Sequence, residues 1–186
     1  MGKRDRNIYE AFGNLFFVTS TVVGFLEVFR HEALCDIMID NLKFYQDRGD
    51  FIILAYVIMP NHFHLIIKVN EGHTISSCIG NLKRITSRQI TEKLQISGND
   101  KLLTDLDKEA GKEPTNDSKI WKNRFDSFVL MNEDTLRQKI EYIHGNPARK
   151  GLVDDLTNWK YSSASDYYGT GLGILAVDKE WKCLRY

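Results

Sequence analysis

Two histidines that flank a single residue are the first feature of this sequence that could do chemistry. His62 and His64 lie in the stretch 62–69, where Phe63 and every second residue after it are apolar. Alternate side chains of a β-strand point to opposite faces, so we expect both imidazoles on one face and Phe63 on the other. Neighbouring imidazoles are good cis ligands for one divalent ion, although a bare pair of this kind is more often a strand surface without metal.

A tyrosine and an asparagine form a second constellation, on a predicted helix. Tyr142 and Asn146 are four residues apart, which places them on the same helix face. At about 100° per residue, Tyr142 lies roughly 120° from the centre of the helix's apolar stripe, so it is not an obvious core residue. The simplest interpretation of Tyr142 alone is half-buried packing with its hydroxyl in water. Asn146 could simply cap the end of the helix.

Basic residues gather in two parts of the chain. They are Lys83, Arg84 and Arg88 on one face of a predicted helix, and Arg124, Arg149 and Lys150 farther along. A solvated face is the ordinary explanation of such charges on any one helix. Aromatic residues in the later part would allow unpaired bases to stack there; they are Trp121, Phe125 and Tyr142.

Hydrophobic periodicity predicts the elements that must position these residues. Strands are expected at 15–19, 51–59, 62–69 and 125–130, and helices at about 31–48, 74–97 and 132–144. Pro147 opposes continuation of the last helix. Residues 98–118 are polar and lack periodicity, so we interpret them as a mobile insertion.

The order of these elements predicts an α+β protein. It is that of a ferredoxin-like split βαβ unit (βαββαβ), an antiparallel sheet with an additional C-terminal helix that carries the tyrosine. The apolar stripe of that helix is Leu136, Ile140 and Ile143. We expect one domain over 1–168 and a C-terminal tail over 169–186. Because this fold hosts many functions, the functional argument must rest on the site.

Composition excludes several classes of protein. The 186 residues are 42% apolar and 27% charged, and 25 basic residues balance 25 acidic ones, which argues against a uniformly basic coat protein or an acidic disordered tail. Cys35, Cys78 and Cys183 are widely spaced, so neither a zinc ribbon nor a disulfide framework is predicted. The longest apolar run, 51–60, is half of a membrane span. We therefore expect a cytoplasmic protein with no membrane partner.

Four segments together resemble single-strand tyrosine transposases. Residues 56–65, YVIMPNHFHL, resemble the HUH signature of this family, and residues 142–153, YIHGNPARKGLV, resemble the second signature of its REP-associated branch. The segments WKNRFD at 121–126 and WKYSS at 159–163 are similar to elements that accompany the tyrosine helix there. The two main motifs are specific together because they occur in the right order, about 80 residues apart.

The resemblance implies a metal-dependent DNA transposase. His62 and His64 would hold Mg²⁺ or Mn²⁺, with Asn146 at the third ligand position. Tyr142 would attack a phosphate of single-stranded DNA beside a hairpin or REP-like palindrome and form a 5′-phosphotyrosine link, so rejoining needs no ATP. The six basic residues named above would contact phosphates. The protein would be a monomer or a homodimer, and a dimer could donate the tyrosine helix in trans.

Three other functions are compatible with the same fold. A catalytically silent or domesticated protein could keep only the affinity for DNA hairpins, and it is the main alternative. A replication-initiator nickase would share the chemistry, but the short chain lacks a helicase motif. A ferredoxin-like regulator would bind a small molecule without metal and without salt-dependent DNA affinity.

Overall fold

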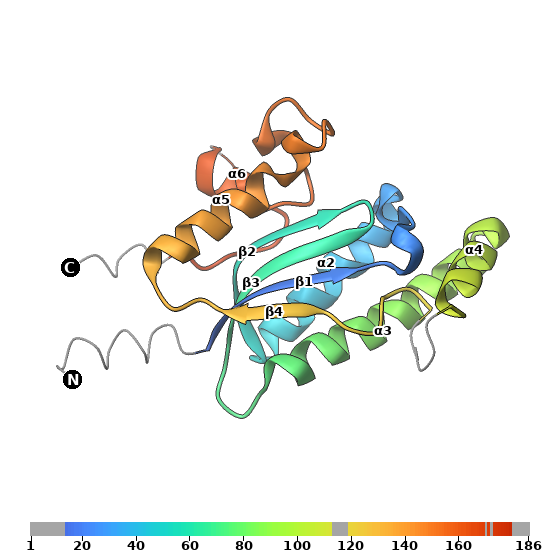
Figure 1. The fold of residues 1–186 in the computed structure, drawn as a ribbon. Coiled ribbons are helices and arrows are strands. Elements are labelled where there is room, and N and C mark those ends of the chain that lie inside the picture. The colour runs from blue at the N-terminus through green and yellow to red at the C-terminus, as the bar shows by residue number, and fades with distance from the viewer. Residues whose placement is uncertain (1–13, 113–118, 170, 172, 180–186) are drawn as a thin grey trace.

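The core of the structure is a four-stranded antiparallel sheet. The computed structural model describes residues 14–112, 119–169, 171 and 173–179. Its strands are β1 (Leu15–Thr21), β2 (Phe51–Met59), β3 (His62–Val69) and β4 (Asp126–Val129), in the order β2-β3-β1-β4 (Figure 1). This is the strand order of a ferredoxin-like sheet, and the predicted α+β fold is confirmed.

Helices cover both faces of the sheet and divide the core in two (Figure 1). Helices α2 (Glu32–Asp47) and α3 (Ile75–Ile96) pack on one face, and α5 (Glu133–Arg149) packs on the other. Strand alternation explains the division, because Phe63 belongs to the core under α2 and α3 whereas Ile66 belongs to the core under α5. The predicted stripe of α5 is buried in this second core: Leu136, Ile140 and Ile143.

Helix α4 (Asp100–Ala110) replaces most of the insertion expected at 98–118. The interpretation of this segment as irregular was wrong for these residues, and 113–118 lie outside the described part of the chain. The helix begins at Asn99, whose side chain accepts a hydrogen bond from the N–H of Leu102. Leu106 is buried against the main core. The few apolar residues of this polar segment therefore follow a short helical periodicity, which the sequence analysis missed.

Helix α5 continues beyond the predicted end near His144. Asn132 caps its start by accepting a hydrogen bond from the N–H of Thr135. The helix runs through the buried Pro147 to Arg149, so the expected stop was misplaced. A proline in the last turn removes one intrahelical hydrogen bond and leaves the preceding turns intact. The extra turn keeps Asn146 within the helix.

The segment after α5 joins this helix to the edge strand β2. Ser163 precedes the short helix α6 (Ala164–Tyr168), and its N–H donates to the carbonyl oxygen of Tyr56 at 3.0 Å. The hydroxyl oxygen of Ser163 lies 2.7 Å from Nε2 of His144 on α5. Part of the predicted tail also packs on the sheet, because Leu175 is buried in the main core.

No helix among the described residues is long and apolar enough to cross a membrane.

Candidate functional site

The two histidines open the third strand and face the α5 side of the sheet. His62 pairs with Thr21 and His64 with Thr19 across the β1–β3 ladder. Their ring centroids are 4.8 Å apart, as expected for side chains two residues apart on one strand. The predicted placement of both imidazoles on one face is confirmed.

His64 is buried and has one ring nitrogen available to a ligand. Its side chain stacks on Phe17 with a centroid separation of 5.3 Å, and its Nδ1 lies 2.7 Å from Oγ1 of Thr19. Its Nε2 is buried without a hydrogen-bond partner among the described residues. Burial, and then the nearby His62, lower the pKa of His64 to about 3. The imidazole is therefore neutral at neutral pH and can offer a lone pair from Nε2.

His62 is half-buried, and burial also lowers its pKa, with Lys150 as the second cause. Its Nδ1 lies 2.7 Å from Oδ1 of Asn61. A metal ion binds only unprotonated imidazole, so the lowered pKa values of both histidines favour metal binding over proton binding.

Helix α5 brings Tyr142 onto the histidine pair of the same chain. The Tyr142 ring lies 5.3 Å from the His64 ring, and the residue remains 41% exposed. The ring also meets the edge of Phe17 at 6.1 Å. Tyr142 is therefore reachable from solvent while it stands beside the histidines.

Two cations flank the Tyr142 ring. The ammonium of Lys139 lies 5.3 Å from the ring centroid and contacts Phe17 and Phe128 as well, each at 5.1 Å. The guanidinium of Arg149 lies 4.8 Å from the centroid and donates to the carbonyl oxygen of Tyr142. These cation–π contacts hold the ring in place and surround it with positive charge.

A hollow of about 510 Å³ contains the candidate metal ligands and the tyrosine. We call it the His-pair hollow; its lining includes His62, His64, Tyr142, Asn146 and Lys150. Asn146 is buried one helical turn beyond Tyr142. Two neutral imidazoles, one with an orphaned buried nitrogen, and an amide oxygen form a donor set that suits a divalent cation. The residues present therefore fit the Mg²⁺ or Mn²⁺ expected from the sequence.

The six predicted phosphate-contacting residues do not lie together. Arg149 and Lys150 are exposed beside the tyrosine, and Arg124 is exposed near the end of β1. Arg84 and Arg88 are exposed on α3, which covers the opposite face of the sheet from α5 (Figure 1). The structure does not bring these two residues to the His-pair hollow.

Lys83 is a correction to the predicted set. It is 7% exposed, and its ammonium donates to the carbonyl oxygens of Lys122 and Asn123 at 2.8 and 2.9 Å. These bonds tie α3 to the segment before β4, so Lys83 has a structural role, and its ammonium is buried instead of being presented at the surface. The expected stacking role of Trp121 is also wrong, because its ring is fully buried and its indole N–H donates to Thr86.

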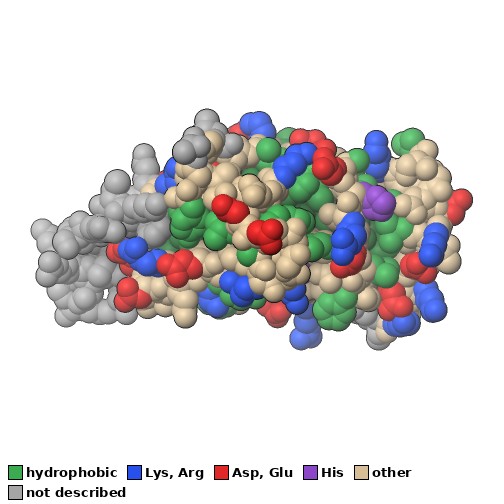
Figure 2. Space-filling model, turned by 90° about the horizontal axis from the view of Figure 1, so that it is seen from above, with side chains coloured by type: hydrophobic (Ala, Val, Ile, Leu, Met, Phe, Trp, Pro, Cys, Tyr) green, Lys and Arg blue, Asp and Glu red, His purple; other side chains and the backbone are tan. Residues whose placement is uncertain are grey.

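The face of the molecule on which α5 lies carries both signs of charge. In the face seen from above, acidic and basic side chains alternate without a uniform basic patch (Figure 2). This distribution agrees with a formal net charge of zero. Any attraction for a polyanion must therefore come from local groups of cations.

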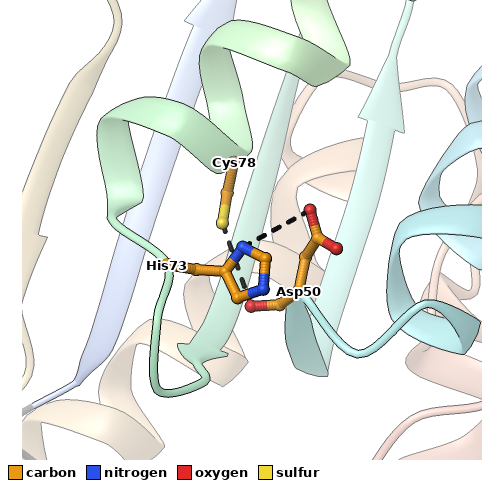
Figure 3. A group of neighbouring side chains, drawn as sticks. All are labelled: Asp50, His73 and Cys78. Atoms are coloured by element: carbon orange, nitrogen blue, oxygen red, sulfur yellow. Dashed lines mark hydrogen bonds and ion pairs between the residues drawn. The ribbon is translucent and has the colours of Figure 1, made fainter.

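A second group of potential metal ligands lies at the far end of the sheet. Ligand atoms of Asp50, His73 and Cys78 lie within 4.8 Å of one another (Figure 3). Asp50 precedes β2 at the end where Phe51 pairs with Val69, whereas His62 pairs with Met59 at the other end. Both carboxylate oxygens of Asp50 already accept hydrogen bonds from Arg48. This group is best described as an ion pair between the buried Asp50 and the partly exposed Arg48, with Nδ1 of His73 3.8 Å from the Asp50 carboxylate.

A family model matches the part of the chain that carries the two histidines and the tyrosine. The family model described as "Transposase IS200 like" matches residues 27–146, well over half of the sequence. The chain belongs to this IS200-like transposase family. The matched range includes both histidines, Tyr142 and Asn146, and the resemblance seen in the sequence motifs is confirmed.

Two curated relatives carry the name REP-associated tyrosine transposase. One from Haemophilus influenzae is 27% identical over 115 residues, which cover 61% of this chain and 58% of the relative. One from Escherichia coli is 25% identical over 122 residues, covering 66% and 59%. The aligned part thus spans less than two thirds of each relative's length.

A solved structure shares the fold of this IS200-like chain. It is a REP-associated tyrosine transposase bound to a REP hairpin, with a TM-score of 0.59 and 23% identity, covering 90% of this chain and 87% of that one. This likeness supports the ferredoxin-like architecture.

Three residues of the site were not found by sequence reasoning. Thr19 contacts His64 across the ladder, Lys139 covers Tyr142, and Phe25 lines the His-pair hollow. Strand register, which sequence alone does not give, brings Thr19 to His64. Lys139 had a weak signal, because it lies three residues before Tyr142 on the same helix.

Proposed function

We propose that this chain is a metal-dependent transposase that nicks and rejoins single-stranded DNA beside a hairpin. The observation that carries the proposal is the meeting of four groups in one hollow: His62, His64, Asn146 and Tyr142. Two of them come from β3 and two from α5. A histidine pair with a facing, solvent-accessible tyrosine supplies a metal site and a nucleophile at one place.

The proposed ligand set would hold the metal by neutral donors. His62 and His64 would donate ring nitrogens, and Asn146 its amide oxygen, to Mg²⁺ or Mn²⁺. When bound, the ion supplies Lewis-acid polarisation of the scissile phosphate. Because all three ligands are uncharged, the anionic phosphate of DNA would add most of the negative charge at the site. We therefore expect DNA and metal to strengthen each other's binding.

Tyr142 acts as the nucleophile. Its phenolic oxygen attacks phosphorus, a new P–O bond to the tyrosine forms, and the bond to the 3′ oxygen breaks; this oxygen takes a proton from water and leaves as a 3′-hydroxyl. The phenolic proton leaves to water, which reaches the ring because Tyr142 is partly exposed. The 5′-phosphotyrosine retains the phosphodiester energy for rejoining to another 3′-hydroxyl.

A single chain brings together all of these groups. Tyr142 lies against His64 of its own chain, which supports a tyrosine acting in cis. Arg149 and Lys150 would hold phosphates beside the tyrosine, and Arg124 would contact the strand farther along. The hairpin is proposed as the substrate because the relative of shared fold was solved with one.

A covalent-adduct assay tests the proposal. The purified protein is mixed with labelled DNA hairpins that carry single-stranded flanks, together with Mn²⁺, and resolved on a denaturing gel. We expect a slow-migrating labelled band that disappears with EDTA and in Tyr142→Phe and His64→Ala. Tyr168→Phe is the matched control, because Tyr168 is 51% exposed on α6 and should leave the band intact.

Two further readouts separate the alternatives. Thermal melting of each variant shows that a lost band is not lost folding, and Mn²⁺ binding measured by electron paramagnetic resonance should weaken in His64→Ala but not in Tyr142→Phe. Salt-sensitive hairpin binding without any adduct would favour a protein that only binds hairpins. An adduct that survives in Tyr142→Phe would refute the assigned nucleophile.

A further inference from the structure

Phe25 is an aromatic side chain that the fold holds out toward solvent. It is 59% exposed, and its φ of 56° is positive, unlike that of any other non-glycine residue in the described part of the chain. A left-handed backbone strains any residue with a β-carbon. Such strain persists only where the surrounding structure imposes it, and it often marks a functional position.

The surroundings of Phe25 fix this conformation on several sides. Val23 is fully buried and its N–H donates to the carbonyl oxygen of Ile120 at 2.9 Å. Asn61, beside His62, donates from Nδ2 to the carbonyl oxygen of Phe25 at 3.2 Å. Gly24 is also left-handed, with φ of 58°, and a β-carbon there would meet the side chain of Glu109 on α4. The turn is thus rigid while its aromatic ring is exposed.

The Phe25 ring lies at the boundary of two hollows. One is the His-pair hollow. The other, of about 640 Å³, we call the basic hollow; its lining includes Lys112, Lys122, Asn123 and Arg124. Phe25 lines both, together with Thr19 and Thr21 of β1. A strand that passes from one hollow to the other must therefore pass this ring.

The charge of the basic hollow suits a phosphate backbone. Three cations and one carboxylate, Asp126, line it; Lys112 is paired with Glu109, so Lys122 and Arg124 are the cations offered to a phosphate backbone. The ammonium of Lys122 lies over one face of the Phe25 ring, 3.7 Å from its centroid, so a base would have to stack on the opposite face. Exposed aromatic rings next to cations are what proteins use to bind single strands, with bases on the rings and phosphates on the cations.

We propose that Phe25 is the stacking platform for one unpaired base in the single-stranded flank of the hairpin. The strand would run along the basic hollow, stack a base on Phe25, and place the neighbouring phosphate in the His-pair hollow. Phe25 is then a positioning residue that fixes which phosphate meets Tyr142. This inference rests on the proposed function, because it requires single-stranded DNA in the site.

Affinity for two hairpin probes tests the platform. One probe is a DNA hairpin with single-stranded flanks selected from a randomised pool, and the other is the same hairpin with blunt ends. Phe25→Asn removes the ring at a position where asparagine tolerates the left-handed backbone. We expect it to weaken binding of the flanked hairpin by roughly 5- to 150-fold, the range of one base–aromatic stack, and to leave blunt-hairpin affinity unchanged. Phe25→Trp should retain the affinity for the flanked hairpin.

Phe44→Asn is the matched control. Phe44 is 55% exposed on α2 and also lies under a cation, with the guanidinium of Arg48 5.4 Å from its ring. It lies outside both hollows, so its loss should change neither affinity. A series of flanked hairpins, each with an abasic nucleotide at a different flank position, locates the stacked base. At one position, removal of the base should weaken binding to wild type but should not weaken binding to Phe25→Asn any further.

The outcomes distinguish this inference from the proposed function. Equal affinities of wild type and Phe25→Asn for the flanked hairpin would overturn the platform while hairpin binding stands. An equal loss on both probes would also overturn it, because the ring would then act on the duplex or the fold. If wild type binds neither probe, the proposed function and the platform fall together.

Discussion

If His64 binds a metal as proposed, Thr19 is expected to fix which of its ring nitrogens carries the proton. Metal binding through Nε2 requires the proton on Nδ1, and Thr19 Oγ1 lies 2.7 Å from Nδ1, where it can accept a hydrogen bond from that N–H. Thr19→Val keeps the shape of the side chain and its preference for strands but removes the acceptor. The variant should therefore fold while it loses control of the His64 tautomer.

The expected loss of metal affinity follows from what remains around His64. Removing an outer partner of a ligating histidine costs 10- to 100-fold in metal affinity, or about 1.4–2.7 kcal/mol. The stack of His64 on Phe17 at 5.3 Å is unaffected by the substitution and still restrains the ring plane. We therefore expect the lower part of that range, a loss of roughly tenfold.

Mn²⁺ titration followed by electron paramagnetic resonance measures this loss, with and without a DNA hairpin. Thr21→Val is the matched control. Thr21 occupies the equivalent place opposite His62, but the Nδ1 of His62 contacts Asn61 instead. Thr21→Val should bind Mn²⁺ like wild type. Wild-type affinity in Thr19→Val, or an equal loss in both variants, would refute the assigned role of Thr19.

Three further predictions concern the tyrosine and the frame that holds it. Lys139→Met should slow adduct formation roughly two- to fivefold, the value of one exposed cation–π contact, and an unchanged single-turnover rate would show that it does not position Tyr142. Ser163→Ala should lower the free energy of unfolding by about 1–3 kcal/mol in denaturant titration, because it leaves buried polar groups with one partner fewer; a loss near zero would exclude Ser163 as a link between α5 and β2. The hydrogen bond from Arg48 holds the pKa of the buried Asp50 carboxyl below its usual range. The ionised carboxylate therefore stabilises the fold above about pH 4, the pKa in the unfolded chain, and this stabilisation is lost as the pH falls through the lower pKa of the folded state. Asp50→Asn should lower stability at neutral pH by about 1–3 kcal/mol and flatten its acid dependence, and acid sensitivity equal to wild type would contradict this.

The elements of the sheet were largely predictable because their patterns are local. The strands predicted at 51–59 and 62–69 have the observed bounds. An uninterrupted apolar run indicates a strand buried on both faces, and an alternating pattern indicates a strand with one apolar face. The predicted helix starts near 74 and 132 agree with the structure, in which Thr74 and Asn132 cap the helices and satisfy N–H groups of the first turn. Helix α4 was missed because its apolar positions are few within a polar sequence.

Which basic and aromatic side chains are exposed could not be predicted from the sequence. The pattern of α3 placed Lys83 on the polar side of its helix, yet the structure buries its ammonium against two backbone carbonyls. Trp121 was expected on a stacking surface and lies in the core, whereas Phe25, which has no sequence signal, is exposed. Exposure depends on which segments pack over a side chain, and these come from distant parts of the chain.

The sequence by itself determined the reactive groups and their local geometry. His62 and His64 share a face because a strand repeats every two residues, and Tyr142 and Asn146 share a face because a helix turns every 3.6 residues. Only the tertiary structure decided that these two faces meet, that Thr19 contacts His64, and that a strained turn exposes Phe25 beside them. Strand order, register and helix packing arise from long-range burial of apolar surface, which the pattern around any one residue does not contain.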